Sequence, residues 1–141
     1  MGTVLYSNDG DVQTFDIGVR GLEQIVVDQR KVPEELRPGL ARQLLASSCL
    51  ACYGAVIQAA LKRAGIGFST VRGEAELGFG LNGEGAGRIR KIHLRFEVVL
   101  KEEKDRLAFN LSSSLFQDPC FITGSLIDGI EVSHEVKAGL A

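Results

Sequence analysis

The fold is decided by the stretch from Leu40 to Gly65, LARQLLASSCLACYGAVIQAALKRAG, which is the longest apolar run in the chain. Its apolar and small residues recur at helical spacing, while its charged residues are confined to the two ends. Lys62 and Arg63 suit the last turn, where cations meet the negative end of the helix dipole. Gly65 suits the position after the helix, because glycine adopts the left-handed conformation at no steric cost. The sequence therefore predicts one long helix over residues 40–65.

The middle of this helix, from Leu44 to Ile57, is apolar or small on nearly every side. Such a helix lies either in a membrane or at the centre of a domain. A membrane span needs about 20 apolar residues, and the charges at both ends make this run shorter. We therefore expect a buried central helix and no membrane contact. A sheet of the same chain or the surface of a partner would cover it.

Length and composition indicate a single domain with room for a core. The chain has 141 residues, a net charge of −2 and 24% charged residues of both signs. A nucleic-acid-binding protein would show a basic surface, so we expect no nucleic-acid partner. The first residues, MGTVLYSNDGDVQ, are polar and acidic rather than basic and then apolar. We therefore expect no signal peptide and a cytoplasmic protein.

The three cysteines are not a disulfide framework, because no secretory signal accompanies them. Metal ligation is not expected either. The two histidines, His93 and His134, each lie in a strand-like alternation and have no second ligand at a useful spacing. We predict no metal and no bound cofactor, and we interpret both histidines as solvated strand residues.

Strands and helices outside the central helix follow from alternation and turn signals. The expected elements are strands over 3–6, 12–19 and 22–28, a charged connection over 28–39, a hairpin with strands over 68–77 and 91–100, helices over 101–117 and 120–128, and a final strand GIEVSHEV over 129–136. Runs of strands separated by helices, without regular βαβ alternation, indicate an α+β fold with an antiparallel sheet.

The glycine-rich segment 77–90 contains Gly78-x-Gly80-x-x-Gly83, which also matches a dinucleotide-binding pattern. That pattern requires a helix to begin within the glycines. Here a strand, KIHLRFEVVL, follows, and Asn82-Gly83 is a strong hairpin signal. We predict the tip of a hairpin and no dinucleotide site.

Two motifs in this order resemble the OsmC/Ohr family of thiol-dependent peroxidases. One is LLASSCLACYGAVIQAALKRAGI (44–66), similar to the family's L-L-x-A-x-x-x-C followed by a small and apolar stretch, a basic pair and Gly-Ile. The other is PCFITGSL (119–126), similar to the family's C-P-V-x-x-x-L at the start of a short helix. Counting back from Gly65 places the family's reactive cysteine on Cys52, and the second motif places its partner on Cys120. The similarity covers about residues 40 to 136.

The resemblance implies one OsmC-like domain over residues 1–141. Residues 1–39 would supply N-terminal strands and a connection, 40–65 the cysteine-bearing helix, and 66–141 the hairpin, two helices and the final strand. It also implies an intertwined homodimer whose antiparallel sheets wrap the two long helices. The activity implied is the reduction of hydroperoxides, organic ones in particular, at sites lined by apolar side chains in the dimer interface.

In the implied chemistry, the Cys52 thiolate attacks the O–O bond and becomes a sulfenic acid. Cys120 then condenses with it to a disulfide, which a dithiol reductant reduces. This order agrees with general thiol chemistry, in which the thiolate is the nucleophile and a nearby thiol prevents further oxidation.

The chain departs from the family pattern near both cysteines. The peroxidases carry a glutamate ten residues before the reactive cysteine, which holds an arginine against the thiolate, and here that position is Arg42. Arg20, in GVRGLE, is the best candidate for the activating arginine. Arg42 is the alternative, but ten residues of helix span about 15 Å, so it would reach Cys52 only by bending back or across the dimer. Phe121 stands where the family has a proline after Cys120.

Other readings of the chain stay open. One is a catalytically weak OsmC-like protein that binds a small apolar or acyl ligand at the dimer interface, and another is a purely structural dimer. Cys49 and Cys52 form a C-x-x-C, but in the middle of a helix instead of at its N-terminus, where the dipole lowers a thiol pKa. We interpret Cys49 as a small core residue, and without the resemblance Cys52 and Cys120 would also be read as buried hydrophobic residues.

Overall fold

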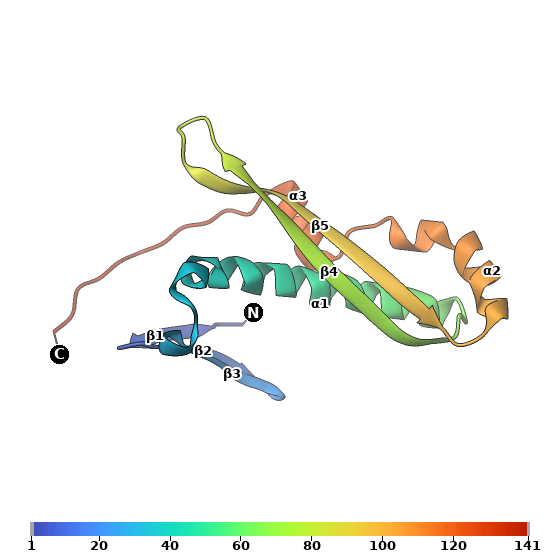
Figure 1. Cartoon of the computed structure of the whole chain (residues 1–141), viewed down its shortest axis with the longest axis horizontal. Coiled ribbons are helices and arrows are strands. Elements are labelled where there is room, and N and C mark those ends of the chain that lie inside the picture. Colours follow the sequence, from blue (N-terminus) through green and yellow to red (C-terminus); the bar gives the residue numbers. More distant parts are fainter. Residues whose placement is uncertain (1, 141) are drawn as a thin grey trace. The chain divides into compact units, whose positions relative to one another are not determined.

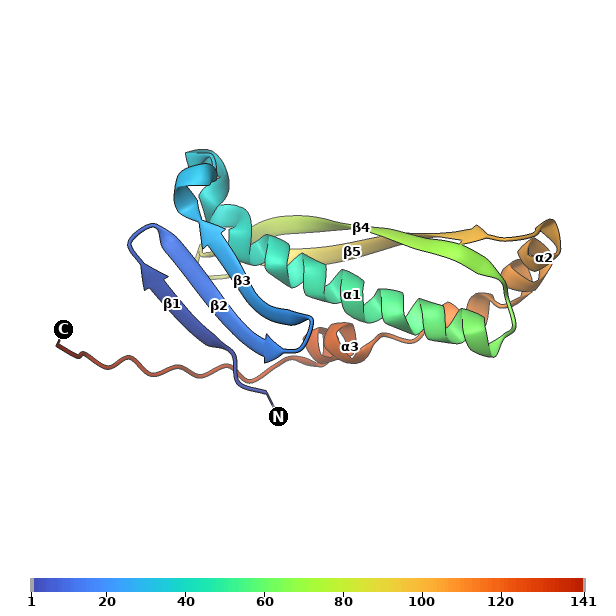
Figure 2. The same cartoon turned by 90° about the horizontal axis from the view of Figure 1, so that it is seen from below.

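The computed structural model describes residues 2–140 and divides into two compact units, one up to Gln43 and one from Leu44 onward. The N-terminal unit holds a three-stranded antiparallel sheet, seen in blue in Figure 2. Its strands are β1 (Leu5–Asp9), β2 (Val12–Val19) and β3 (Leu22–Asp28), in that order across the sheet. The three strands predicted from the sequence are confirmed, with the first one shifted toward the C-terminus by about two residues.

Turns and pairing explain the order of this sheet. Gly10 takes a φ of 62° in the turn between β1 and β2, where only glycine fits without strain. Gly21 takes a φ of 87° in the turn between β2 and β3. The predicted connection after β3 forms two 3₁₀ segments, Gln29–Lys31 and Glu34–Gly39. None of the described residues 2–43 is buried. A sheet with no buried residue gains little hydrophobic stabilisation, so its apolar side chains need a covering surface.

The C-terminal unit is built on α1 (Leu40–Arg63), of which residues 44–63 belong to this unit. A hairpin of β4 (Phe68–Leu81) and β5 (Gly87–Leu100) runs along the helix, as Figure 1 shows. α2 (Glu103–Leu111), a 3₁₀ segment Ser113–Phe116 and α3 (Phe121–Asp128) follow. The predicted α+β class with antiparallel sheet and one long helix is confirmed.

The predicted hairpin tip is confirmed, as a loop over residues 82–86 whose positive φ (81°) is on Gly85 instead of Gly83. The Asn82 side chain accepts hydrogen bonds from the backbone N–H groups of Glu84 (2.9 Å) and Ala86 (3.0 Å). The strand β5 begins directly afterward at Gly87, so no helix begins within the glycines.

The core lies under the C-terminal half of α1. Ile57, Leu61 and Ile66 are buried there, and partly buried apolar side chains of the hairpin, α2 and Phe116 surround them. The contact between helix and hairpin depends on two glycines. The Phe96 ring occupies the space beside Gly54 on α1 and Gly73 on β4, because a Cβ at either position would contact the ring.

The expectation that the central helix is buried on every side is wrong for the single chain. Six residues of α1 are buried, whereas Ala51, Ala55 and Ala59 are exposed. The physical reason is that the apolar pattern of a helix does not tell which chain covers it. The helical segment over residues 34–63 is long and apolar enough to cross a membrane. The core helix of a soluble protein meets the same criteria of length and hydropathy.

Two further predictions need correction. The helix expected over 101–117 ends at Leu111 and continues as a 3₁₀ segment, because Ser112 turns its hydroxyl back to the Ala108 carbonyl (2.7 Å) in the serine-rich run. The final strand expected over 129–136 does not form. Its alternation suits a strand, but none of the described strands pairs with it, and Val132 and Val136 are 81% and 91% exposed.

Candidate thiol site

The three cysteines lie in the C-terminal unit, two on α1 and one directly before α3. Cys49 is fully buried and Cys120 is 3% exposed, whereas Cys52 is half-buried. All three are free thiols. Cys52 is therefore the thiol that a substrate reaches most readily, and the burial of Cys49 agrees with its interpretation as a core residue.

The N-terminus of α3 brings Cys52 and Cys120 together. The Ile122 N–H donates to the Cys52 Sγ at 3.5 Å, and the Thr123 N–H donates to the Cys120 Sγ at 3.4 Å. Cys120 is the N-cap residue, and the Thr123 Oγ1 accepts a hydrogen bond from the Cys120 N–H at 3.0 Å. This is a capping box in which sulfur replaces the usual side-chain oxygen. Both sulfurs thus lie where free N–H groups and the helix dipole favour negative charge.

The interaction of the two thiols shifts their pKa values in opposite directions. The bond to Cys120 raises the pKa of Cys52, against the N–H groups of Ile122 and Phe121, which lower it. Burial alone would raise the pKa of Cys120, but the hydrogen bonds from Cys52 and from Thr123 outweigh burial and lower it. Cys120 therefore ionises first, while Cys52 keeps the proton and donates it toward Cys120.

Tyr53 fixes the segment before Cys120 against α1. Its hydroxyl donates to the Phe116 carbonyl, and its ring contacts that of Phe96 with centroids 5.5 Å apart. Burial raises the pKa of Tyr53, and the negative charges of Cys120 and Asp118 raise it further. The hydroxyl therefore stays protonated as a donor, and the residue next to Cys52 is held from both ends.

Neither arginine predicted as an activator lies in the C-terminal unit. Arg20 is exposed in the turn between β2 and β3, and Arg42 is exposed near the start of α1. Both belong to the N-terminal unit. Within the C-terminal unit, the groups that act on the Cys52 thiol are the other thiol and backbone N–H groups. The role of either arginine stays a prediction.

A cavity of about 640 Å³ lies between α1, β5 and α3, and Cys49 is the cysteine that lines it, whereas Cys52 and Cys120 do not. Cys49, Tyr53 and Thr123 contribute to its wall, and most of the other lining residues are apolar. Arg90 and Lys91 of β5 add two positive charges to this lining, and Asp118 adds one negative charge. The cavity is thus suited to an apolar molecule with an anionic or polar end.

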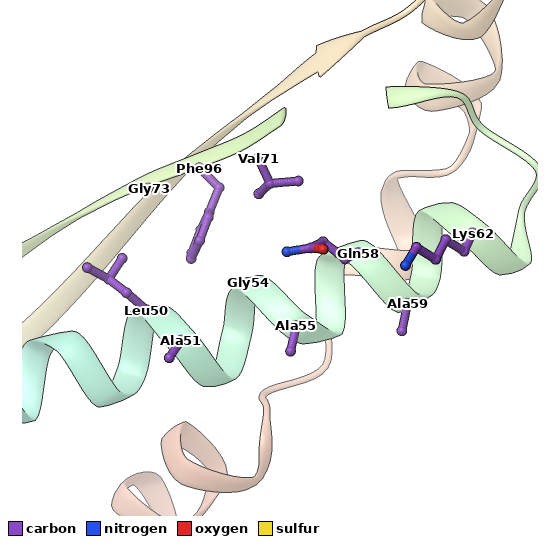
Figure 3. Close-up of a pocket in the computed structure, with 10 residues that line it drawn as sticks. All are labelled: Leu50, Ala51, Gly54, Ala55, Gln58, Ala59, Lys62, Val71, Gly73 and Phe96. Carbon is purple, nitrogen blue, oxygen red and sulfur yellow. The ribbon is translucent and has the colours of Figure 1, made fainter. Parts of the chain in front are cut away.

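A second cavity, of about 550 Å³, is a groove between α1 and the β4–β5 hairpin (Figure 3). Small side chains of α1 form its floor, namely Ala51, Ala55 and Ala59, and Phe96 and Val71 form its hairpin side. None of its lining residues is a cysteine. The groove is therefore separate from the thiol site.

Among residues 2–140, no group of three or more His, Cys, Asp and Glu side chains could hold a metal ion. Both histidines, His93 and His134, have exposed side chains, and His93 lies on a strand as expected.

Sequence reasoning missed the contribution of Thr123 and of the Ile122 N–H. A signal for Thr123 was present, since a threonine three residues after the residue that starts a helix is the arrangement of a capping box. The hydrogen bond from the Ile122 N–H to Cys52 depends on how α3 packs on α1. This packing cannot be predicted from a local sequence pattern.

Comparison with known proteins identifies the fold and the family of the chain. The solved structure of an osmotic stress induced and detoxification response protein from Psychrobacter arcticus is similar in fold, with a TM-score of 0.59 over 89% of this chain and 88% of that chain, at 17% sequence identity. No curated protein matches the sequence. The sequence profile of OsmC-like proteins matches residues 41–135, which include both the long helix with Cys52 and the start of α3 with Cys120. The chain therefore belongs to the family of OsmC-like proteins.

Proposed function

We propose that this chain is a thiol-dependent reductase of organic hydroperoxides whose redox pair is Cys52 and Cys120. The observation that carries the proposal is the position of both sulfurs at the start of α3, where the N–H groups of Ile122 and Thr123 donate to Cys52 at 3.5 Å and to Cys120 at 3.4 Å. Two thiols bound by neighbouring N–H groups of one helical turn are positioned to form a disulfide. The helix N-terminus favours the thiolate of Cys120, which can accept the proton of Cys52 as the reaction starts. Free thiols of this kind persist in a reducing compartment, so we propose a cytoplasmic location.

Cys52 acts as the nucleophile because it is the more exposed of the two thiols. It passes its proton to the Cys120 thiolate as its Sγ attacks the outer oxygen of the hydroperoxide. The O–O bond breaks, and the alcohol leaves with that proton, so Cys52 becomes a sulfenic acid. Cys120, again a thiolate, attacks the oxidised sulfur. The S–S bond forms and the oxygen leaves as water once it is protonated. A dithiol reductant then reduces the disulfide and is itself oxidised to a disulfide.

Activation of Cys52 in this scheme comes from α3 and from Cys120. Arg20 or Arg42 is proposed to add positive charge at the thiolate. Replacing each arginine by alanine and measuring the rate of Cys52 oxidation at several salt concentrations tests that addition, because a charge contribution falls as salt screens it.

The test of the proposal is a free-thiol count before and after one equivalent of cumene hydroperoxide is added to the reduced protein. We expect the loss of two thiols per chain within seconds, and no disulfide in Cys52→Ser. In Cys120→Ser, oxidation should stall at the sulfenic acid or beyond after a single turnover. Three thiols that survive unchanged in the wild-type protein would refute the proposal, and full multiple turnover by Cys120→Ser would refute the role of Cys120.

We also propose that the functional unit is an intertwined homodimer. Three observations support it: the sheet of the N-terminal unit has no buried residue, the face of α1 with Ala51, Ala55 and Ala59 is exposed, and the apolar alternation after Gly129 has no partner strand. Small residues spaced four apart let a second helix approach closely. Light scattering coupled to size-exclusion chromatography tests the proposal, and a monomer at micromolar concentration would refute it.

A second candidate function is the binding of a small acyl ligand with little or no turnover. The cavity beside Cys49 and Thr123, with Arg90 and Lys91 in its lining, favours it. Mass spectrometry of the purified protein under native conditions would detect a retained ligand. A retained ligand together with thiols that survive peroxide would favour this candidate over the reductase.

A further inference from the structure

Thr123 makes more contacts with Cys120 than its place in the capping box requires. The Thr123 Oγ1 lies 3.1 Å from the Cys120 Sγ, in addition to accepting from the Cys120 N–H at 3.0 Å. Its backbone N–H donates to the same sulfur at 3.4 Å. A weaker contact of 3.5 Å joins the hydroxyl to the Cys120 carbonyl. The side chain thus has one acceptor role and one proton to donate.

The proton of that hydroxyl has two possible acceptors, and the charge of Cys120 selects between them. While Cys120 is a thiol, its own S–H can donate to the Thr123 Oγ1. Once Cys120 is a thiolate, the sulfur carries no proton and Thr123 becomes the donor, at the shorter of the two distances. Hydrogen bonds to a charged acceptor are about twice as strong as those to a neutral one. A disulfide sulfur carries no charge, so the Thr123 donors bind the reduced form of Cys120 more strongly than the oxidised form.

We propose that Thr123 is a positioning residue that stabilises the Cys120 thiolate as the leaving group when a dithiol reduces the Cys52–Cys120 disulfide. This inference rests on the proposed redox pair. The reductant attacks the Cys52 Sγ, because Cys52 is half-buried and Cys120 is 3% exposed. The S–S bond breaks, and its electron pair goes to the Cys120 Sγ, which the O–H and N–H of Thr123 bind. The second thiol of the reductant then displaces Cys52 as a thiolate, and the reductant leaves as a disulfide. A better-stabilised leaving thiolate leaves faster.

The test compares Thr123→Val, Thr123→Ser and a matched control, Ser125→Ala. Valine removes the hydroxyl but keeps the shape and the backbone N–H, whereas serine restores the hydroxyl. Ser125 is also on α3, but its hydroxyl bonds the Phe121 carbonyl at 2.7 Å instead of a sulfur. The measurements are the equilibrium of the disulfide with dithiothreitol and the rate of its reduction by dithiothreitol. Circular dichroism of each variant checks that α3 and the fold persist.

We expect Thr123→Val to shift the equilibrium about tenfold toward the disulfide, which is about 30 mV for a two-electron couple, and to slow reduction about threefold to tenfold. Thr123→Ser should restore most of both, and Ser125→Ala should change neither. A wild-type equilibrium and rate in Thr123→Val, or no recovery in Thr123→Ser, would overturn the inference. If peroxide forms no disulfide in the wild-type protein, the proposed function fails first, and that result is distinct from an unchanged Thr123→Val.

Discussion

Replacing Gly73 by alanine should loosen the contact between the β4–β5 hairpin and α1. A Cβ at this position would lie 2.6 and 2.8 Å from two atoms of the Phe96 ring and 3.1 Å from the Leu50 Cδ2. The ring cannot simply turn away, because Gly54 and Tyr53 lie beside it. It lies 3.5 Å from the position that a Cβ on Gly54 would take, and it packs on the Tyr53 ring. Either the ring or the helix must move.

The magnitude follows from two opposing terms. Forcing an additional methyl group into a packed contact typically costs about 1–3 kcal/mol. Alanine in place of a strand glycine stabilises the folded state by roughly 0.5–1 kcal/mol, because the unfolded chain has less backbone entropy to lose. We therefore expect a net loss of about 1–2 kcal/mol in the free energy of unfolding, which corresponds to a fall of about 0.5–1 M in the urea midpoint.

The assay is urea unfolding followed by circular dichroism, with Gly87→Ala as the matched control. Gly87 is also a strand glycine, but a Cβ there has no neighbour within 4 Å and its φ is not positive, so alanine should leave stability equal or slightly higher. The double variant Gly73→Ala/Phe96→Leu should lose less than the sum of the two single variants, because the smaller side chain makes room. A Gly73→Ala protein that is as stable as the wild type would refute the reasoning about this contact.

Three further predictions concern other parts of the chain. Asp105→Ala should lower the free energy of unfolding by about 1–3 kcal/mol, and Asp105→Asn by less, because the buried carboxylate accepts the Gly67 N–H at 3.1 Å; equal effects of the two in urea unfolding would contradict this. Burial raises the pKa of the Cys49 thiol above its ordinary value of 9.0. Above pH 9 the unfolded chain therefore loses this proton while the folded chain keeps it, so the free energy of unfolding falls as the pH rises. Urea midpoints of the reduced protein should therefore fall above about pH 9, and less steeply in Cys49→Ala; equal slopes would exclude Cys49 as the cause. Ala55→Arg adds a charge to an exposed position of the single chain, so light scattering should detect a shift from dimer to monomer without unfolding, and an unchanged dimer would exclude this face from the interface.

The strands, the hairpin and the long helix were predictable because each depends on local pattern. Alternation over β2 and β5, the Asn82-Gly83 turn and the charges at the ends of α1 contain that information within a few residues. The strands expected over 68–77 and 91–100 are each four residues longer at the hairpin tip, reaching Leu81 and Gly87. The glycines at 78 and 80 weaken the strand signal, while the pairing of β4 with β5 continues through them.

What covers each apolar surface was not predictable from one sequence. The exposed face of α1 and the unpaired segment after Gly129 both have the pattern of buried elements. A periodic pattern reports that a face is apolar, and it does not report whether the cover comes from the same chain. For the candidate site, the family motifs identified Cys52 and Cys120, whereas the contact of both with α3 required the packing of that helix.

The position of Cys120 as the cap of α3 also makes it a reporter of local opening. With 3% of the residue exposed and its sulfur bonded to the Thr123 N–H, an alkylating reagent such as iodoacetamide has no room to attack while the first turn is formed. Cys52 should label directly, and Cys120 only when that turn opens. The labelling rate of Cys120, measured by mass spectrometry across urea concentrations below the unfolding transition, would therefore give the free energy needed to open the start of α3 separately from that of global unfolding.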